Sequence, residues 1–399
     1  MPTAPDARRR LLHTSLARMP ASLFQFDPRM AEGWLADRYF VRTAGTLAED
    51  GRDPVVRMQL FAKQRGILAG VPEVIRMLET QLAPIPAVNG RPATLHDFTI
   101  DTLLDGDEID PAEPVMHITG PYLAFAHLET AYLGVLARRT LVASNVRRAI
   151  SAAAGKPVIF MAARHDDWRV QVPDGYAAMV GGAELVSSDA NTAWWGNSGG
   201  SGTMPHSMIA AYGGDTVAAT LAFTRYVRAH EPEVGVVSLV DYQNDVIGTS
   251  LAVARAMRAE YGPGALQAVR VDTSESLVDA SLAGYAATHP REPSGGVNAR
   301  LVRTLRDALD AADFPEVGII VSGGFTPARI GAFERLRVPV IAYGVGSSLL
   351  GHNAGEPAGL LTSFDFTADV VRVDGRRESK VGREERGNDR FVRLDPDEV

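Results

Sequence analysis

The sequence contains no cysteine, so the chain has no disulfide, no thiolate nucleophile and no cysteine-ligated zinc site. It also lacks any apolar run near the ~18 residues that a membrane-spanning helix needs. Positive charge is in the minority, and a net charge of −8 argues against broad neutralisation of nucleic-acid phosphates. A local basic pocket for a small anion is still compatible with that charge. Near the N-terminus, His13 and Arg18 interrupt the apolar residues, so we expect no secretion signal and a cytoplasmic protein.

A chain of 399 residues is long enough for two domains. Over residues 1–134, strand-like segments at 39–43, 55–62 and 115–120 surround an expected helix at 71–82, which predicts an α+β domain with an antiparallel sheet. The segment 351–399 carries a strand-like run at 366–373, followed by the hairpin signal Asp374-Gly375. We expect this last segment to return to the first domain or to a subunit interface.

Between residues 135 and 350, short apolar runs alternate with helical stretches. The expected strands are 158–161, 184–187, 236–240, 268–271, 318–321 and 340–343. Such a βα repeat predicts a parallel sheet. Because six or seven strands are visible rather than eight, the predicted fold is an irregular parallel α/β barrel of about seven strands. An N-terminal α+β sandwich domain, completed by the C-terminal segment, is expected beside it.

Two glycine-rich turns end consecutive expected strands: Ser322-Gly323-Gly324 and Gly344-Val345-Gly346-Ser347. Between them, Thr326 is a suitable N-cap and Pro327 a suitable first helical residue. Glycines let backbone N–H groups approach an anion closely, and a helix N-terminus adds partial positive charge. We therefore expect both turns to lie on one edge of the sheet and to bind a phosphate. Two tight connections without a ligand are the alternative.

Polar residues follow the other expected strands, where parallel sheets carry their active sites. Asp241 and Asp272 can accept hydrogen bonds from sugar hydroxyls or bind Mg²⁺; helix capping is the alternative for each. Arg164 and Arg270 offer planar guanidinium groups for a carboxylate or phosphate, with structural ion pairs as the alternative. His206 lies in an expected loop and can carry a proton or attack phosphate, unless it is a loop histidine without function.

Two catalytic motifs are tempting but lack their context. Gly196-Asn197-Ser198-Gly199-Gly200 matches the G-x-S-x-G pattern of serine hydrolases. It does not follow an apolar strand and runs into more glycine rather than a helix, so Ser198 is a poor candidate nucleophile. No G-x-x-x-x-G-K-[ST] sequence exists, so ordinary P-loop nucleotide binding is not expected.

Seven motifs in a common order give the chain a resemblance to the nicotinate phosphoribosyltransferase family, a group of type II phosphoribosyltransferases, and to its shorter archaeal and bacterial members. The motifs lie at 37–43, 120–123 with Glu129-Thr130, 138–144, 202–206, 269–273, 321–325 and 343–346. Each motif is only moderately specific alone, and their order on expected strand ends carries the signal. The resemblance implies an enzyme that joins nicotinate to phosphoribosyl pyrophosphate, giving nicotinate mononucleotide and pyrophosphate in NAD salvage.

The resemblance also implies roles for the polar strand ends. The turns at 322–324 and 344–347 match those that hold the 5-phosphate, and Asp241 and Asp272 match carboxylates near the ribose hydroxyls. His206 matches a histidine that ATP phosphorylates to drive the reaction. Mg²⁺ is expected to act with the pyrophosphate of the substrate.

The resemblance also implies a substrate pocket with three arginines and a tyrosine, in which Arg164 lies near the base and the pyrophosphate. Arg164 and Arg270 match arginines of the substrate pocket, and Arg139 is expected to join them. Tyr39 matches an aromatic residue that reaches the pyridine ring from a neighbouring subunit. We therefore expect at least a homodimer with a shared active site.

Two departures from the family pattern lie close to the expected base pocket. Met161-Ala162 stand where the family usually has Phe-Gly, and Gly181-Gly182-Ala183-Glu184-Leu185 replace a Gly-Gly-x-Asp-Gly segment. These changes leave open a phosphoribosyltransferase for another pyridine-type base. The alternative from a different functional class is a non-catalytic paralogue that binds nucleotide.

Overall fold

The computed structural model describes residues 5–84, 86–87, 91–194, 200, 202–352 and 360–399. Its contacts divide the chain into two compact units. The first comprises Met1–Ser144, Tyr176–Gly181 and Leu361–Val399, and the second comprises Asn145–Gly175 and Gly182–Leu360. The sequence-based limits at residues 134 and 350 stay a prediction.

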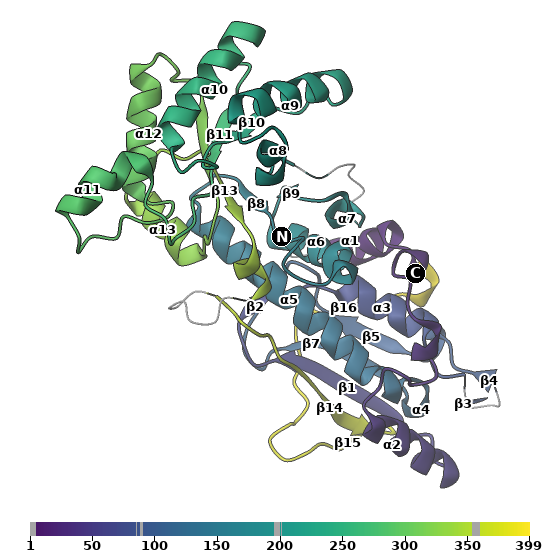
Figure 1. The fold of residues 1–399 in the computed structure, drawn as a ribbon. Helices are drawn as coiled ribbons and strands as arrows, with labels where there is room; N and C mark the ends of the chain where they lie inside the picture. Colours follow the sequence, from purple (N-terminus) through teal and green to yellow (C-terminus); the bar gives the residue numbers. More distant parts are fainter. Residues whose placement is uncertain (1–4, 85, 88–90, 195–199, 201, 353–359) are drawn as a thin grey trace. The chain divides into compact units, whose positions relative to one another are not determined.

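The first unit is built on a six-stranded antiparallel sheet, whose strand order is β15-β14-β1-β7-β5-β16. Its members are β1 (Val55–Ala62), β5 (Thr99–Thr102), β7 (Pro114–Pro121), β14 (Phe366–Val373), β15 (Arg376–Arg377) and β16 (Val392–Arg393). At its centre, Leu60 of β1 pairs with Met116 of β7 on one side and with Ala368 of β14 on the other. The C-terminal strand therefore completes a sheet begun by the N-terminal half of the chain (Figure 1).

Helices pack one face of this sheet into a single apolar core. They are α1 (Pro5–Arg18), α3 (Val71–Thr80), α4 (Tyr122–Phe125) and the long α5 (Glu129–Ala152). One buried cluster joins strands and helices that are far apart in sequence, and it includes Leu60, Ile118, Ile75 and Leu136. Two short sheets lie outside it: β2 (Gly66–Ile67) with β6 (Glu108–Ile109), and β3 (Pro86–Ala87) with β4 (Arg91–Pro92).

The segment 39–43, predicted as a strand, is instead part of helix α2 (Arg38–Glu49), with Asp37 in the N-cap position. The helix packs against α4 and the short 3-10 helix η5 (Ala126–Leu128) and buries Phe40. Tyrosine, phenylalanine and valine favour strands, but this packing overrides local propensity. The strands predicted at 55–62 and 366–373 and the turn at Asp374-Gly375 are confirmed.

The second unit contains a six-stranded parallel sheet with the order β10-β11-β12-β13-β8-β9. Its strands are β8 (Val158–Phe160), β9 (Leu185–Val186), β10 (Val237–Leu239), β11 (Ala268–Val271), β12 (Gly318–Val321) and β13 (Ala342–Val345). All six predicted strands are thus present. The sheet curls into a half-barrel with β10 and β9 as its edges, which confirms an incomplete α/β barrel.

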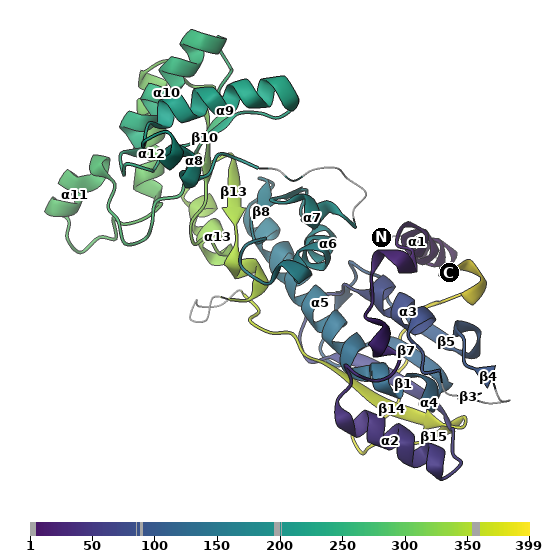
Figure 2. The same cartoon turned by 45° about the vertical axis from the view of Figure 1, so that its right-hand side comes forward.

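Helices connect these strands, as a parallel sheet requires. They are α6 (Gln171–Gly181), α7 (Asp189–Thr192), α8 (His206–Ala211), α9 (Thr216–His230), α10 (Val246–Tyr261), α11 (Ala283–Thr288), α12 (Ala299–Ala311) and α13 (Pro327–Arg335). Helix α10 packs against both α9 and α12 beside the strands (Figure 2). Helix α13 begins as predicted, because the Thr326 side chain accepts a hydrogen bond from the backbone N–H of Arg329.

Candidate active site

A cavity of about 460 Å³ opens at the carboxyl ends of the parallel strands. Asp272 follows β11, Ser322 follows β12, Gly346 follows β13 and Met161 follows β8. The lining residues all belong to the second unit: Met161, Arg164, His165, Pro205, His206, Ser207, Arg270, Asp272, Ser322, Gly323, Gly324, Phe325, Gly344, Gly346, Ser347 and Ser348. The expectation that polar strand ends converge on one edge is thus confirmed.

The first glycine turn is held in a conformation that other residues rarely adopt. Gly323 and Gly324 have φ angles of +82° and +67°. A Cβ on Gly323 would also lie 3.1 Å from the Asp272 carboxylate. That carboxylate accepts a hydrogen bond of 2.7 Å from the Ser322 hydroxyl, so the turn and the neighbouring strand end are joined.

The second glycine turn lies directly beside the first, because β12 and β13 are parallel neighbours and Val321 pairs with Tyr343. A Cβ on Gly344 would lie 3.1 Å from the Cβ of Ser322 and 2.6 Å from the sulfur of Met161. Glycine therefore lets two strand ends approach closely at this point. The predicted adjacency of the two turns is confirmed, and their phosphate-binding role stays a prediction.

The residues around the second turn divide between cavity and core. Gly346 and Ser347 line the cavity, and Ser347 starts the 3-10 helix η8 (Ser347–Leu350). Val345, predicted with them, is fully buried in β13, where its carbonyl accepts a 2.7 Å hydrogen bond from the N–H of Met161. Its side chain is therefore a core group, and its backbone ties the second turn to the loop after β8.

His206 is the first residue of helix α8 rather than a loop residue, with Pro205 in the N-cap position. Its Nε2 lies 3.2 Å from each carboxylate oxygen of Asp241. The imidazole is 45% exposed, whereas the side chain of Asp241, just after β10, is 6% exposed. Burial raises the pKa of Asp241, while the charge and the hydrogen bond of His206 oppose that rise. The pair combines a buried carboxyl group with an accessible ring.

Arg270 links the cavity to the loop that precedes His206. Its guanidinium donates to the Thr203 hydroxyl at 2.6 Å and to the Met204 carbonyl at 3.3 Å. Burial lowers the pKa of Arg270, and the nearby carboxylates of Asp272 and Asp241 oppose this effect. Its Nε is buried and has no hydrogen-bond partner among the described residues. A donor in this state is suited to a substrate oxygen.

Arg164 and His165 bring positive charge and a second imidazole to the rim. Arg164 is exposed, and a Cβ on Gly346 would lie 2.6 Å from Cε1 of His165. Burial lowers the pKa of His165, and the charges of Arg164 and His352 lower it further. The sequence pattern selected Arg164 and placed Met161 near the expected base pocket, but it did not select His165, Ser207, Phe325 or Ser348. Their positions beside predicted site residues are the only signal that points to them.

Besides Asp241 and Val345, described above, three further sequence-based candidates are not among the residues that line the cavity. Arg139 of α5 forms a buried ion pair with Glu73, at 3.0 and 3.1 Å, and Tyr39 of α2 is 59% exposed, with its hydroxyl 3.3 Å from Asp37. Both belong to the first unit, and their roles in binding substrate stay predictions. Ser198 and its glycine motif fall outside the described residues.

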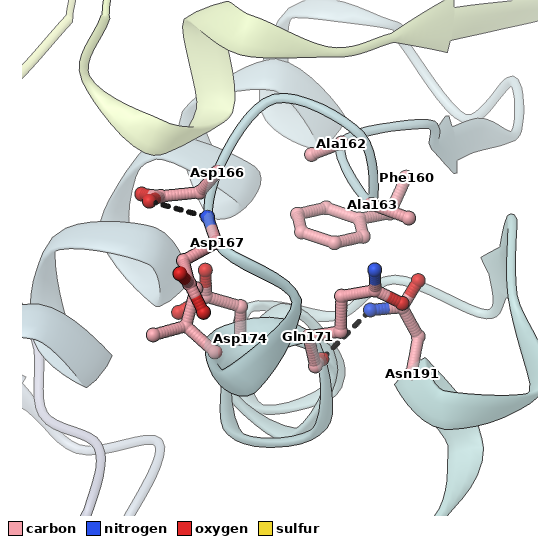
Figure 3. A pocket seen from close by; sticks show the side chains of 9 residues that line it. Phe160, Ala162, Ala163, Asp166, Asp167, Gln171, Asp174 and Asn191 are labelled. Carbon is pink, nitrogen blue, oxygen red and sulfur yellow. Dashed lines mark hydrogen bonds between the residues drawn. The ribbon is translucent and has the colours of Figure 1, made fainter.

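A second cavity lies under the loop after β8 and measures about 10 Å³, room for about one water molecule. Figure 3 shows Phe160 above it, with Asp166 and Asn191 at its sides. Asn191 donates a 2.7 Å hydrogen bond to the Gln171 carbonyl, which closes its base. This space is too small for a substrate and belongs to the packing beneath the loop.

The described residues contain no group of three or more His, Cys, Asp or Glu side chains arranged to hold a metal ion. No helix in the described part of the chain is long and apolar enough to cross a membrane.

Comparisons with known proteins agree with this architecture. Residues 37–140 match the family model described as quinolinate phosphoribosyl transferase, N-terminal domain. Nicotinate phosphoribosyltransferase pncB1 of Mycobacterium tuberculosis is 29% identical over 385 residues, which cover 90% of this chain and 78% of that protein.

Solved structures extend the similarity to the whole fold. A nicotinate-nucleotide pyrophosphorylase from Pyrococcus furiosus superposes with a TM-score of 0.72 at 26% identity, covering 92% of this chain and 84% of that one. Human nicotinic acid phosphoribosyltransferase shares the fold, with a TM-score of 0.59 at 16% identity over 86% of this chain and 75% of that one. The matching N-terminal domain, the relative and the common fold point the same way: the chain is similar to nicotinate phosphoribosyltransferases along most of its length.

Proposed function

We infer that this protein is a nicotinate phosphoribosyltransferase, which joins nicotinate to phosphoribosyl pyrophosphate and releases pyrophosphate in NAD salvage. The observation that carries this conclusion is the pair of adjacent glycine turns that share one cavity with Asp272 and Arg270. The similarity to the mycobacterial nicotinate phosphoribosyltransferase along 90% of the chain supports the same reaction.

The cavity suits substitution at the anomeric carbon of the ribose. The turns at 322–324 and 344–347 bind the 5-phosphate through backbone N–H groups, and Asp272 and Asp241 orient the ribose hydroxyls. Positive charge develops on the sugar as pyrophosphate departs, and Arg164 and Arg270 stabilise the departing negative charge. The protein contributes mainly orientation and electrostatics.

Mg²⁺ fits this site as a partner of the substrate. Asp241 and Asp272 supply the oxygen ligands that a hard cation prefers, but the described residues contain no group of three or more His, Cys, Asp or Glu side chains that could hold the ion by itself. Most of its ligands would therefore come from the pyrophosphate and water. When bound, the ion neutralises charge on that group.

ATP acts as a co-substrate through His206. A neutral imidazole that donates Nε2–H to Asp241 keeps its lone pair on Nδ1, and this nitrogen can attack the γ-phosphorus of ATP as the bond to the bridging oxygen breaks and ADP leaves. His206→Ala should abolish ATP stimulation and labelling of the enzyme by γ-³²P-ATP. His230→Ala, at the end of α9, is the matched control and should leave both unchanged.

We further propose a cytoplasmic homodimer with a shared active site, to which Tyr39 contributes from the neighbouring subunit. The exposed ring of Tyr39 on α2 supports this arrangement. Light scattering of the full chain should give a dimer. A mixture of Tyr39→Ala and His206→Ala proteins should recover up to about a quarter of the activity, if subunits exchange and one intact site forms in each mixed dimer.

Quinolinate is the second candidate for the base, because the matching family model is described by quinolinate. The identity of the base needs a direct test, because Met161 lines the cavity at a position where the family pattern has phenylalanine. Pyrophosphate release should be measured with nicotinate, nicotinamide and quinolinate. We expect turnover with nicotinate; turnover with quinolinate alone would support the second candidate, and no turnover with nicotinate would remove the first.

A further inference from the structure

Arg329 of α13 contacts the first glycine turn but does not line the cavity. One guanidinium nitrogen, Nη1, donates to the carbonyls of Gly323 at 2.9 Å and Gly324 at 3.0 Å. The other, Nη2, donates to the Val297 carbonyl at 2.7 Å. The guanidinium also lies over the Phe325 ring, 4.5 Å from its centroid. One side chain therefore fixes the turn, the ring that follows it and the segment before α12.

These contacts set the direction of two backbone N–H groups. A peptide group is planar and trans, so its N–H points away from its C=O. With the carbonyls of Gly323 and Gly324 bound to Arg329, the N–H groups of Gly324 and Phe325 must point away from Arg329. Within the described chain these two N–H groups have no hydrogen-bond partner. Gly324 and Phe325 line the cavity and Arg329 does not, so the free donors are turned toward the cavity.

The ion pair of Arg329 is a minor part of this arrangement. Nη1 lies 3.0 Å from Glu275, but the side chain of Glu275 is 74% exposed, whereas that of Arg329 is 22% exposed. Exposed ion pairs contribute little, so the carbonyl contacts dominate. A Cβ on Gly324 would lie 2.8 Å from the Glu275 carboxylate and 3.1 Å from Nη1 of Arg329, so any other residue here would have to displace these side-chain ends, in addition to adopting a φ angle of +67°.

We propose that Arg329 is a positioning residue for the phosphate end of the substrate. It keeps the N–H groups of Gly324 and Phe325 directed into the cavity before the substrate binds. Two successive glycines have many accessible conformations, and a fixed turn binds an anion without first losing that freedom. The proposal rests on the proposed function for the identity of the substrate, because a ribose 5-phosphate group is the anion that the turn receives.

The chain offers a matched control at the opposite end of the same strand. Arg306 of α12 donates to the carbonyls of Val317 at 2.6 Å and Phe314 at 2.8 Å, just before β12. It also pairs with Asp310, and its side chain is 18% exposed. Arg306 is absent from the cavity lining. Arg306→Met therefore removes comparable carbonyl contacts without touching the turn.

The test compares the full-length wild type, Arg329→Met and Arg306→Met by calorimetric titration with ribose 5-phosphate and, separately, with pyrophosphate. We expect Arg329→Met to weaken ribose 5-phosphate binding at least 10-fold and to leave pyrophosphate binding within 2-fold. Arg306→Met should leave both affinities unchanged. In steady state, the KM for phosphoribosyl pyrophosphate should rise about 10-fold in Arg329→Met, while the KM for nicotinate stays the same.

Arg329→Lys separates geometry from charge, because lysine keeps the charge but lacks the planar guanidinium whose two nitrogens contact three carbonyls. It should lose most of the affinity that the methionine variant loses. Equal ribose 5-phosphate affinities for Arg329→Met and Arg306→Met, or full affinity in Arg329→Lys, would overturn the proposal. If Arg329→Met fails to fold, Gly324→Ala disturbs the same contact from the turn, and wild-type affinity in that variant would also overturn it.

Failure of the proposed function has a different signature. The wild type would then make no nicotinate mononucleotide, yet the dependence of ribose 5-phosphate binding on Arg329 would still be measured. A wild type that does not bind ribose 5-phosphate would overturn the role of Arg329 itself.

Discussion

The Nε2 atom of His206 lies 3.2 Å from both carboxylate oxygens of Asp241, so the carboxyl group holds the imidazole symmetrically. Asp241 is buried after β10, and His206 begins α8 at the cavity wall. The carboxylate thereby selects the tautomer that carries its proton on Nε2 and leaves Nδ1 available. Asp241 has this orienting role in addition to its proposed contact with the ribose.

Asp241→Asn tests this orienting role. Asparagine keeps the size but loses the negative charge that fixes the ring, so we expect the ATP-dependent labelling of His206 to fall by about 10²-fold. The initial rate of labelling by γ-³²P-ATP is the measurement. Asp245→Asn, in the same loop, is the control: Asp245 caps α10 through the Gly248 N–H at 3.0 Å, and asparagine also caps helices well. Equal labelling rates in the two variants would contradict the assignment.

Gly323→Ala should damage the site more than the fold. The φ angle of +82° strains alanine, and the new methyl carbon would lie 3.1 Å from the Asp272 carboxylate. We expect the KM for phosphoribosyl pyrophosphate to rise at least 10-fold.

Gly331→Ala, inside α13, is the control variant, and it should stabilise the fold because alanine favours a helix by about 1 kcal/mol over glycine. That variant should unfold at a higher urea concentration with unchanged kinetics, and a similar KM in both variants would argue against the phosphate role.

Arg270→Lys should affect both substrate binding and the ATP step. Lysine keeps the charge, but it cannot contact Thr203 and Met204 and also offer a further donor to the cavity. We expect kcat/KM for nicotinate to fall about 10²-fold and ATP stimulation to decline with it, since residues 203–204 precede His206. Unchanged ATP stimulation beside a raised KM would show that Arg270 acts on the substrate alone.

His117 should make stability depend on pH. Burial lowers the pKa of His117 to about 4, and the charge of Arg57 contributes to the lowering. The unfolded chain, with a pKa near 6.5, takes up the proton more readily. The contribution of neutral His117 to the free energy of unfolding is therefore fully present above about pH 6.5. It falls as the pH drops toward 4, by up to about 1.4 kcal/mol per pH unit.

His117→Phe removes this titration and the 3.2 Å contact of His117 Nε2 with the Gln59 side-chain oxygen, which still accepts a hydrogen bond from the N–H of Arg386. Urea unfolding at pH 7.5 and pH 5 should show the wild type losing up to about 2 kcal/mol relative to the variant as the pH falls. A difference that does not change with pH would exclude His117 as the group responsible.

Much of the secondary structure could be predicted because its signals are local. The strands at 55–62, 268–271, 318–321 and 366–373 coincide with β1, β11, β12 and β14, since short apolar runs ending at small or polar residues specify buried strands. Helix α2 was mistaken for a strand, because the packing of Phe40 on distant helices outweighs the strand preference of its first residues. The start of α8 at His206 was missed for lack of a polar N-cap before it.

The candidate site was predictable only where a residue type suited to binding or catalysis directly follows an expected strand. That rule selected Asp272, Ser322 and Gly344, which the structure brings to one cavity. It could not select Arg329, which lies on the following helix and acts through backbone carbonyls. Nor could it select His165, whose place beside Gly346 depends on the pairing of β13 with β8.

The amino-acid sequence by itself determined the alternation of strands and helices and the glycines and carboxylates that end the strands, because these features depend on neighbouring residues. Tertiary structure alone decided that β13 lies between β12 and β8 and that β14 joins β1. Strand order is set by the burial of apolar faces and by hydrogen bonds between segments far apart in the chain, which no local pattern encodes.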